Sequence, residues 1–553
     1  MGDRRNVTRR TLLEGVAAAG AASLMRPADG LASAFELSGP VSSRWVGSLS
    51  AESERLRAPR RFSLVGVQWA GPAAATIELR ARGLDGGWSP WAIASVLGHD
   101  GDREGRREGL FGEPVWTGPA EYVQARSDRP VAGLRLHFVS VTPSGSRARA
   151  AQGLPLAQPV LNAGPGQPPI IARQAWALGR ARPTSFAGYG TVKLAFVHHT
   201  VNPNGYSASE VPALLLAIYD YHVYTRGFFD VAYNFLIDSY GRIWEGRAGG
   251  IDMAVVGAQA GGYNTESTGV AIIGDFMKVG PSQAAISALK RLLAWKLSLH
   301  GVPAHGRVTV VVNPADYFYT PFGPGAHVSL PRVAGHRDGD LTDCPGNALY
   351  GELPSIRARI DALAGTPARL DIAAPTASTA GVAVVLSGRL RQLGGAGLAG
   401  APIELQELGL PGVATTRTTV ATATTAADGS WGASVALQRN AALRAVHAQQ
   451  PAAVTDWAHV SVAPALTLTV QSASPPVVSG TISPPKRQVV VDLYLAGHAG
   501  DKPVRHKRVP ASGGHFSARL RPPAPGNYVI VAVSEADSAN AAGASPQVAL
   551  TVT

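Results

Sequence analysis

The chain has 553 residues, a net charge of +12 and a single cysteine. This length suits several domains of about 100–200 residues each, and one cysteine excludes a fold held by intramolecular disulfides. The positive charge favours an anionic partner such as a cell-wall polymer, although an arginine-biased genome would give the same charge. Because no basic–aromatic stripe or nucleic-acid motif accompanies it, we expect no nucleic-acid partner.

Residues 1–34 have the features of an export signal. Arg9 and Arg10 precede a weakly apolar, alanine-rich stretch, and residues 32–34 (Ala-Ser-Ala) offer the small side chains of a cleavage site. The arginine pair is typical of the twin-arginine pathway, and an ordinary secretory signal is the alternative. Both predict a secreted, cell-wall-associated protein. No other run approaches the ~20 apolar residues of a membrane span, so we expect no transmembrane anchor.

Residues 35–142 are predicted to form a β-rich domain. Residues 76–80 and 134–138 alternate with period two, and glycine-rich turn signals lie between them. Four tryptophans of this region are expected in its core, with sugar stacking as the alternative: Trp69, Trp88, Trp91 and Trp116. Residues 143–169 are rich in Pro, Gly, Ala and Ser without periodicity and are predicted to be a linker.

Residues 170–365 alternate predicted strands with predicted helices. Ser209 is a candidate N-cap for a helix to Tyr224, and Ser282 for a helix to His300. Strands are expected at 194–197, 231–237, 242–245 and 270–273. The pattern predicts an α/β domain, a mixed sheet with flanking helices.

The chain returns to β patterning after residue 366 and repeats itself. Short apolar strands and turn signals recur with a period of roughly 90 residues, and this spacing predicts two tandem immunoglobulin-like β-sandwiches, 366–465 and 466–553. Such modules either bind wall glycans or hold the α/β domain at a distance, and spacing is the expected role because fold alone assigns no function.

The single cysteine lies in a sequence that suggests a metal site. Cys344 follows His336 by eight residues, and a histidine pair, His198-His199, lies upstream. Thiolate and imidazole are ligands that zinc favours, and two imidazoles with one thiolate leave a fourth position open, as a catalytic zinc site requires. The alternative is that Cys344 is a small buried hydrophobe.

Several stretches carry a resemblance to a known family. In chain order they are 196–200 (Phe-Val-His-His-Thr), 221–222 with 226–230, 231–235 (Val-Ala-Tyr-Asn-Phe), 241–247, 261–264, 269–276, 335–338 (Gly-His-Arg-Asp) and 344–346 (Cys-Pro-Gly). Together they resemble the peptidoglycan recognition protein and type-2 N-acetylmuramoyl-L-alanine amidase family, over about a third of the chain.

This resemblance implies a set of site residues and a reaction. It makes His198, His336 and Cys344 the ligands of Zn²⁺, and Tyr233 and Thr342 catalytic residues. It implies hydrolysis of the amide between the lactyl group of N-acetylmuramic acid and L-alanine in peptidoglycan or muropeptides. The alternative is a protein that binds peptidoglycan without cutting it. His199 and His222 are expected to be hydrogen-bonded structural histidines, since neighbours in a strand point to opposite faces.

Other positions depart from the family pattern. Residues 248–253 are longer than the usual stretch, and Gln259 stands where a histidine is common. Glu266 stands where members specific for diaminopimelic acid often carry arginine, so a carboxylate there would repel that amino acid. The group that protonates the leaving amine is unassigned: Glu245 is the nearest candidate by motif, with a salt-bridged strand end as the stronger alternative. Residues 165–366 are expected to fold and act alone.

Overall fold

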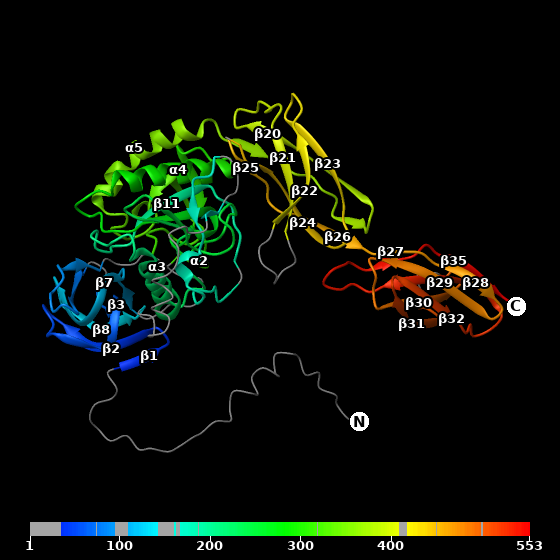
Figure 1. Cartoon of the computed structure of the whole chain (residues 1–553), viewed down its shortest axis with the longest axis horizontal. Coiled ribbons are helices and arrows are strands. Elements are labelled where there is room, and N and C mark those ends of the chain that lie inside the picture. The colour runs from blue at the N-terminus through cyan, green and yellow to red at the C-terminus, as the bar shows by residue number, and fades with distance from the viewer. Residues whose placement is uncertain are drawn as a thin grey trace, which may run out of the picture.

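The computed structural model describes residues 35–72, 75–94, 109–141, 160–161, 166–185, 187–317, 319–408, 417–449, 451–498 and 502–553. Figure 1 shows four bodies that follow one another along the chain, from the N-terminal β domain to the C-terminal one. The export signal predicted for residues 1–34 lies outside the described residues, as does most of the predicted linker. Within the described part, no helix is long and apolar enough to cross a membrane.

In the described residues of the N-terminal domain, the regular secondary structure consists of strands. They form one eight-stranded sheet in the order β1-β2-β8-β3-β7-β4-β5, with β6 beside β3. Trp69 and Trp116 are buried, as expected of core residues. Trp88 is 36% exposed, and the guanidinium of Arg80 lies 5.1 Å from its ring and 4.5 Å from that of Trp91, so the core assignment of Trp88 is wrong. The strands are β1 (Phe35–Ser38), β2 (Val41–Leu49), β3 (Leu56–Ala70), β4 (Ile77–Gly83), β5 (Ala92–Ile93), β6 (Leu110–Phe111), β7 (Val115–Ser127) and β8 (Val131–Val139).

The central domain has the predicted α/β layout. Its seven-stranded sheet has the order β17-β11-β14-β12-β13-β10-β9, and its first four strands are parallel. A β15–β16 hairpin stands beside this sheet. The strands are β9 (Val160–Leu161), β10 (Ile170–Ile171), β11 (Leu194–His199), β12 (Phe235–Ile237), β13 (Ile243–Glu245), β14 (Ser267–Ile272), β15 (Arg307–Val311), β16 (His327–Pro331) and β17 (Val333–Gly335). The helices are α2 (Gln174–Ala177), α3 (Val211–Asp220), η1 (Tyr221–Arg226), η2 (Asn264–Glu266), α4 (Gln283–Leu299), η3 (His336–Asp338) and α5 (Asn347–Ala364).

Strand β11 shows how the sheet separates its two faces. Ala195 and Val197 pack into one core with α4 and α5. Leu194 and Phe196 face the other side, where they join a core with the β15–β16 hairpin. Successive side chains of a strand alternate between faces, so His198 falls on the side of Phe196, and their rings lie 6.3 Å apart.

Of the two helices predicted for this domain, one begins at the expected cap and the other is correct in kind but differs in extent. The Ser282 cap of α4 is confirmed, since its hydroxyl accepts from Ala285 N at 3.1 Å. The preceding helix starts after Glu210 rather than Ser209 and is α-helical only to Asp220, where the π-helix η1 continues it. Such π segments are rare and often lie at functional sites.

The predicted strand 231–237 is also shorter than expected. Only Phe235–Ile237 pairs in the sheet. The side chain of Asn234 accepts from Gly269 N at 2.7 Å and donates to Val255 O at 2.9 Å. These side-chain bonds add to backbone bonds from Asn234 N to Gly269 O and from Gly246 N to Asn234 O, both 3.0 Å long. In the stretch predicted as linker, Val160–Leu161 forms β9 and pairs with β10.

The residues after 366 are β-rich, as predicted. The first C-terminal domain has a three-stranded sheet (β18-β20-β23) and a six-stranded one (β19-β26-β24-β21-β22 with β25), which enclose one core. Its strands are β18 (Ala368–Leu370), β19 (Ala377–Thr379), β20 (Ala383–Gln392), β21 (Pro402–Leu408), β22 (Arg417–Thr424), β23 (Ser430–Ala436), β24 (Ala441–His447), β25 (Ala453–Val454) and β26 (Ala458–Ala463).

The second C-terminal domain has a core of its own around a nine-stranded sheet. Its strands are β27 (Ala465–Leu466), β28 (Thr469–Ala473), β29 (Pro476–Ser483), β30 (Gln488–Leu495), β31 (Arg505–Ser512), β32 (His515–Arg519), β33 (Gly526–Ser534), β34 (Gly543–Ala544) and β35 (Val548–Val552). The immunoglobulin-like assignment of these two domains stays a prediction.

The N-terminal domain and the central domain share one apolar core. Buried residues of the first, namely Val41, Leu64, Phe111, Trp116, Val139 and Val141, belong to the same cluster as residues of α2, α3 and η1. The first C-terminal domain makes a different contact. Arg417 and Arg444 both pair with the buried carboxylate of Asp252, in the stretch 248–253 that is longer than the family pattern.

Candidate metal centre

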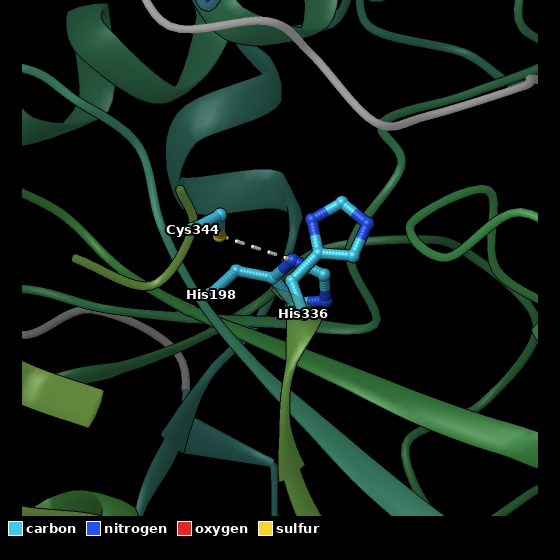
Figure 2. Close-up of side chains that lie close together, drawn as sticks. All are labelled: His198, His336 and Cys344. Carbon is cyan, nitrogen blue, oxygen red and sulfur yellow. Dashed lines mark hydrogen bonds between the residues drawn. The ribbon is translucent and has the colours of Figure 1, made fainter. Parts of the chain in front are cut away.

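The three predicted metal ligands meet at the ends of two neighbouring parallel strands. His198 lies near the end of β11, and β17, paired beside it, leads directly into His336. The loop after η3 then brings Cys344 back to the same place. One ligand atom from each residue lies within 4.8 Å of the others, and Figure 2 shows the three side chains together.

The donor set suits a zinc ion. The rings of His198 and His336 lie 4.5 Å apart, and Sγ of Cys344 lies 3.6 Å from Nδ1 of His198. All three residues are at most 1% exposed. Burial lowers the pKa of His198, which keeps the imidazole in the neutral form that ligates metals, and burial raises the pKa of the Cys344 thiol. A bound cation would reverse the second effect, because a coordinating thiol loses its proton.

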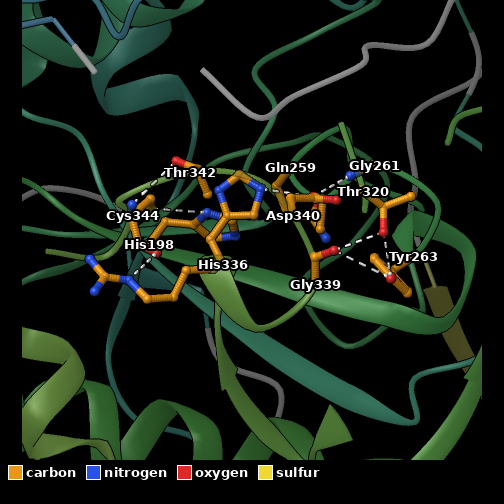
Figure 3. Close-up of polar contacts among 12 residues, drawn as sticks. His198, Gln259, Gly261, Tyr263, Thr320, His336, Gly339, Asp340, Thr342 and Cys344 are labelled. Carbon is orange, nitrogen blue, oxygen red and sulfur yellow. Dashed lines mark hydrogen bonds and ion pairs between the residues drawn. The ribbon is translucent and has the colours of Figure 1, made fainter. Parts of the chain in front are cut away.

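Asp340 holds one ligand in place and was missed in the sequence. Its Oδ2 lies 3.0 Å from Nε2 of His336 and accepts from Gly261 N at 2.8 Å (Figure 3). With the proton on Nε2, His336 keeps Nδ1 for a metal, which is the usual role of a carboxylate behind a ligating histidine. An aspartate four residues after a candidate ligand was the available signal.

The neighbouring histidines are hydrogen-bonded elsewhere, as expected of structural residues. Nδ1 of His199 accepts from Phe276 N at 3.3 Å, and Nδ1 of His222 accepts from Ala232 N at 3.2 Å. Burial lowers the pKa of each to about 3, so both stay neutral. Neither belongs to the ligand cluster found among the described residues.

The two predicted catalytic residues lie beside the ligands. The ring of Tyr233 is 5.3 Å from that of His198 and 1% exposed, and burial raises the pKa of its phenol well above the usual value. The phenol therefore stays protonated and can donate a hydrogen bond. Oγ1 of Thr342 accepts from Cys344 N at 3.2 Å, which places it beside the backbone of that ligand.

Three further residues considered from the sequence have partners of their own. Glu245, at the end of β13, accepts from Arg173 N at 2.9 Å, so its carboxylate joins β13 to the backbone that follows β10. Gln259 is fully buried and donates to Ser267 Oγ at 3.0 Å. Glu266 forms an ion pair with Lys193.

Comparisons with known proteins agree with this architecture. Residues 188–347 match the family model described as N-acetylmuramoyl-L-alanine amidase, and residues 27–155 match one described as Rv3811 N-terminal galactose-binding domain-like. Peptidoglycan-recognition protein 2 of Holotrichia diomphalia is 32% identical over 128 residues, 23% of this chain and 66% of that protein. Peptidoglycan-recognition protein 1 of the same organism is 28% identical over 186 residues, 34% of this chain and 79% of that protein.

Among solved structures, wild-type Drosophila PGRP-LB is 27% identical, with 34% of this chain and 92% of that chain covered and a TM-score of 0.26. Fold and site define the central body as an α/β domain with a buried His-His-Cys cluster. The sequence matches assign it further: the central domain belongs to the peptidoglycan recognition protein and type-2 amidase family. The N-terminal β domain is galactose-binding-like.

Proposed function

We propose that the chain is a secreted, zinc-dependent N-acetylmuramoyl-L-alanine amidase that cleaves peptidoglycan between the lactyl group of N-acetylmuramic acid and L-alanine. The observation that carries the proposal is the complete cluster of His198, His336 and Cys344, with Tyr233 beside it. Binding alone needs no metal position left open, whereas hydrolysis does. The twin-arginine export predicted for residues 1–34 is part of the proposal.

The residues divide the work as follows. His198, His336 and Cys344 hold the zinc ion, and Asp340 orients His336. When bound, zinc polarises the scissile carbonyl and lowers the pKa of water. The phenol of Tyr233 donates to the oxygen on which negative charge develops. Thr342 accepts from Cys344 N and so keeps the loop of Cys344 in shape, with a neutral hydroxyl beside that ligand.

The rival function is recognition of peptidoglycan without cleavage. The curated relatives quoted above are named as recognition proteins, which favours binding of muropeptides in either case. The two functions differ in one measurable product, the free amino group of L-alanine, which only an amidase releases.

The metal experiment tests the proposal directly. The purified full chain is expected to contain one zinc, and a chelator is expected to abolish release of stem peptide from muropeptides until zinc is restored. Cys344→Ser is expected to lose most of the zinc and the activity, because a hydroxyl is a far poorer ligand than a thiolate. His305→Asn, which alters an exposed histidine outside the cluster, is the matched control. Full zinc occupancy in Cys344→Ser would refute the ligand set.

A second variant separates cleavage from binding. Tyr233→Phe is expected to keep zinc and muropeptide affinity but to lower turnover by roughly 10²–10³, the effect of losing one oxyanion donor. Unchanged turnover would make Tyr233 a packing residue. A zinc-loaded wild type that binds muropeptide and releases no peptide would establish the recognition function instead.

A further inference from the structure

The N-terminal domain has a cleft that is lined mainly by arginines. It lies at the start of β3 beside β2, and its volume is about 790 Å³. The charged side chains of this arginine cleft are Arg44, Arg57, Arg60, Arg61 and Glu121. A guanidinium keeps its charge at any physiological pH, so four positive groups face one negative group.

An irregularity of the sheet brings the arginines of β3 together. Strand β3 pairs with β7 at Arg57 and Tyr122, and again at Phe62 and Ala120. Residues 58–61 of β3 therefore stand opposite the single residue Glu121 of β7. Extra residues of this kind are left out of the ladder and bend the strand that contains them. The bulge thus adds Arg60 and Arg61 to a cleft that already contains Arg57.

Backbone carbonyls hold two of the arginines in place. Arg44 donates from Nη1 to Arg57 O at 2.7 Å, which joins β2 to β3. Arg60 donates from Nη2 to Gly39 O at 2.7 Å, which joins the bulge to the turn between β1 and β2. A guanidinium has five N–H donors, so this bond occupies one donor of Arg60. Side chains fixed in this way lose less conformational entropy when a ligand binds.

The positive charge of the cleft is not balanced by the residues that the structure describes. Its one carboxylate is already engaged, because Nε of Arg61 donates to Glu121 at 2.9 Å. Arg57 and Arg60 form no ion pair within the described part of the chain, and Nε of Arg60 is buried there without a hydrogen-bond partner. Partial burial lowers the pKa of Arg60, so its surroundings oppose the charge. An anion in the cleft offsets that cost.

The lining of the cleft also indicates what kind of polyanion fits. No aromatic side chain is among the described residues that line it. Proteins that bind single-stranded nucleic acid combine a positive groove with aromatic rings on which the bases stack. The arginine cleft has the charge without the rings, which favours a polymer whose charged groups are its main feature.

We propose that the arginine cleft binds an anionic polymer of the cell wall through phosphodiester or carboxylate groups repeated along its chain. Guanidinium forks match both kinds of oxyanion in a bidentate manner. All residues of the cleft belong to the N-terminal domain, so this site is separate from the candidate metal centre and does not depend on the amidase function. Binding there raises the local concentration of the central domain beside peptidoglycan, as a second binding module does.

The test is calorimetric titration of the full chain with poly(glycerol phosphate) and with polygalacturonate. Neutral dextran and oligo(dT) are the comparison polymers. Arg57 is exposed, so its substitution leaves the fold intact. Arg57→Glu is expected to weaken binding about tenfold, because one attraction is lost and one repulsion is added at an exposed site. Arg57→Gln, which only removes the attraction, is expected to weaken it about threefold.

The matched control is Arg82→Glu, which changes the net charge of the chain by the same amount. Arg82 also donates to a backbone carbonyl, that of Gly86 at 2.8 Å, but it lies outside the cleft. This variant is expected to weaken polymer binding by less than about twofold, since distant exposed charges are largely screened. Thermal stability, zinc content and release of peptide from soluble muropeptides are expected to match wild type in all three variants.

Each outcome of the titration bears on the proposal. Tighter binding of poly(glycerol phosphate) identifies phosphodiesters as the recognised group, and tighter binding of polygalacturonate identifies carboxylates. Equal losses in Arg57→Glu and Arg82→Glu would overturn the proposal, because overall charge would then attract the polymer. Binding of oligo(dT) as tight as that of the better wall polymer, or no binding of either wall polymer, would also overturn it. Each of these results leaves the amidase proposal intact, since zinc and peptide release are measured separately.

Discussion

The two β domains on either side of the central domain contact it in chemically different ways. The N-terminal domain contributes six apolar residues to a core that it shares with α2, α3 and η1. At the first C-terminal domain, the buried carboxylate of Asp252 lies between two arginines, and the apolar contribution to the core of the central domain is smaller, from Ala452 and the partly buried Val454. One contact therefore resembles the interior of a single domain, and the other an ionic contact between two domains.

Energetics give these contacts different consequences. Apolar burial stabilises in proportion to area, at about 25 cal/mol per Å², so the shared core makes the N-terminal and central domains one folding unit. A buried ion pair contributes little net stability, because desolvation offsets the attraction, but removing one partner is costly. Burial by itself raises the pKa of Asp252, yet Arg444 and Arg417 outweigh it and hold the pKa below its usual range. Such a contact fixes the orientation of a domain without being needed for the site.

The largest expected effect is the loss of folding when the shared core is cut. A chain of residues 165–366 lacks the six apolar partners of α2, α3 and η1, each worth about 1.5–3 kcal/mol, against a total stability of about 5–15 kcal/mol. It is expected to be insoluble or zinc-free, whereas a chain of residues 35–366 folds and cleaves soluble muropeptides. Circular dichroism, zinc content and peptide release check this, and an active 165–366 chain would make the N-terminal domain dispensable.

This expectation corrects the one drawn from sequence, which held that the core and site of residues 165–366 were internal to that stretch. Periodicity predicts which face of a helix is apolar, and it did so for α3, but it does not say which domain covers that face. The partner of Leu214 and its neighbours lies more than 70 residues earlier in the chain.

The next largest effect concerns the ionic contact. Asp252→Asn leaves Arg444, whose side chain is 1% exposed, without its charged partner, and this is expected to weaken the contact by about 3–5 kcal/mol. The C-terminal domain should then unfold in a separate thermal transition, while turnover of soluble muropeptides stays at the wild-type value. Asp371→Asn is the control, because its pair with Arg391 is exposed and worth about 0–1 kcal/mol. Impaired turnover in Asp252→Asn would tie this contact to the site.

The stability of the folded chain is expected to depend on pH in opposite directions through one group near each contact. In the N-terminal domain this group is Glu113, which is 2% exposed. Burial raises the pKa of Glu113 from 4.5 to about 8, so between these values only the folded chain binds the proton, and stability falls as pH rises. Burial lowers the pKa of Lys296, which donates to Ile251 O and Met253 O beside Asp252, from 10.5 to about 7. Between these values only the unfolded chain binds the proton, so stability rises with pH.

Each slope is about 1.4 kcal/mol per pH unit. The measurement is denaturant unfolding of the chelator-treated chain from pH 5 to 10. Glu113→Gln is expected to remove the decline on the acid side of pH 7, and Lys296→Met the rise on the alkaline side of pH 8. A wild-type curve unchanged by either substitution would mean that neither group is perturbed by its interface.

Sequence reasoning succeeded where the signal is local. The Ser282 cap, the apolar strand at 194–197 and the spacing of His336 and Cys344 each depend on neighbours along the chain. It failed where a distant partner decides. Val231–Asn234 reads as a strand, but Asn234 uses its side chain to hold the backbone of Gly269. The burial of Glu113 could not be predicted from the sequence, because its neighbours along the chain do not show that the residue is enclosed.

The smallest expected effect concerns a residue outside both contacts, Glu266. The sequence suggested that its carboxylate repels diaminopimelic acid, but the carboxylate pairs with Lys193, and its Oε2 accepts from Val311 N at 3.0 Å at the end of β15. Because a cation already stands beside it, Glu266→Gln is expected to change the ratio of turnover on diaminopimelate and lysine muropeptides by less than about threefold. Stability should change by only about 1 kcal/mol, because the pair is partly hydrated, with 38% of the Lys193 side chain and 18% of the Glu266 side chain exposed. Glu266→Arg would put two cations side by side and remove the acceptor of Val311, so it should loosen the β15–β16 hairpin rather than improve specificity. A five- to thirty-fold gain on diaminopimelate peptides in Glu266→Arg, or about 1–2 kcal/mol, would instead show that this position faces the stem peptide.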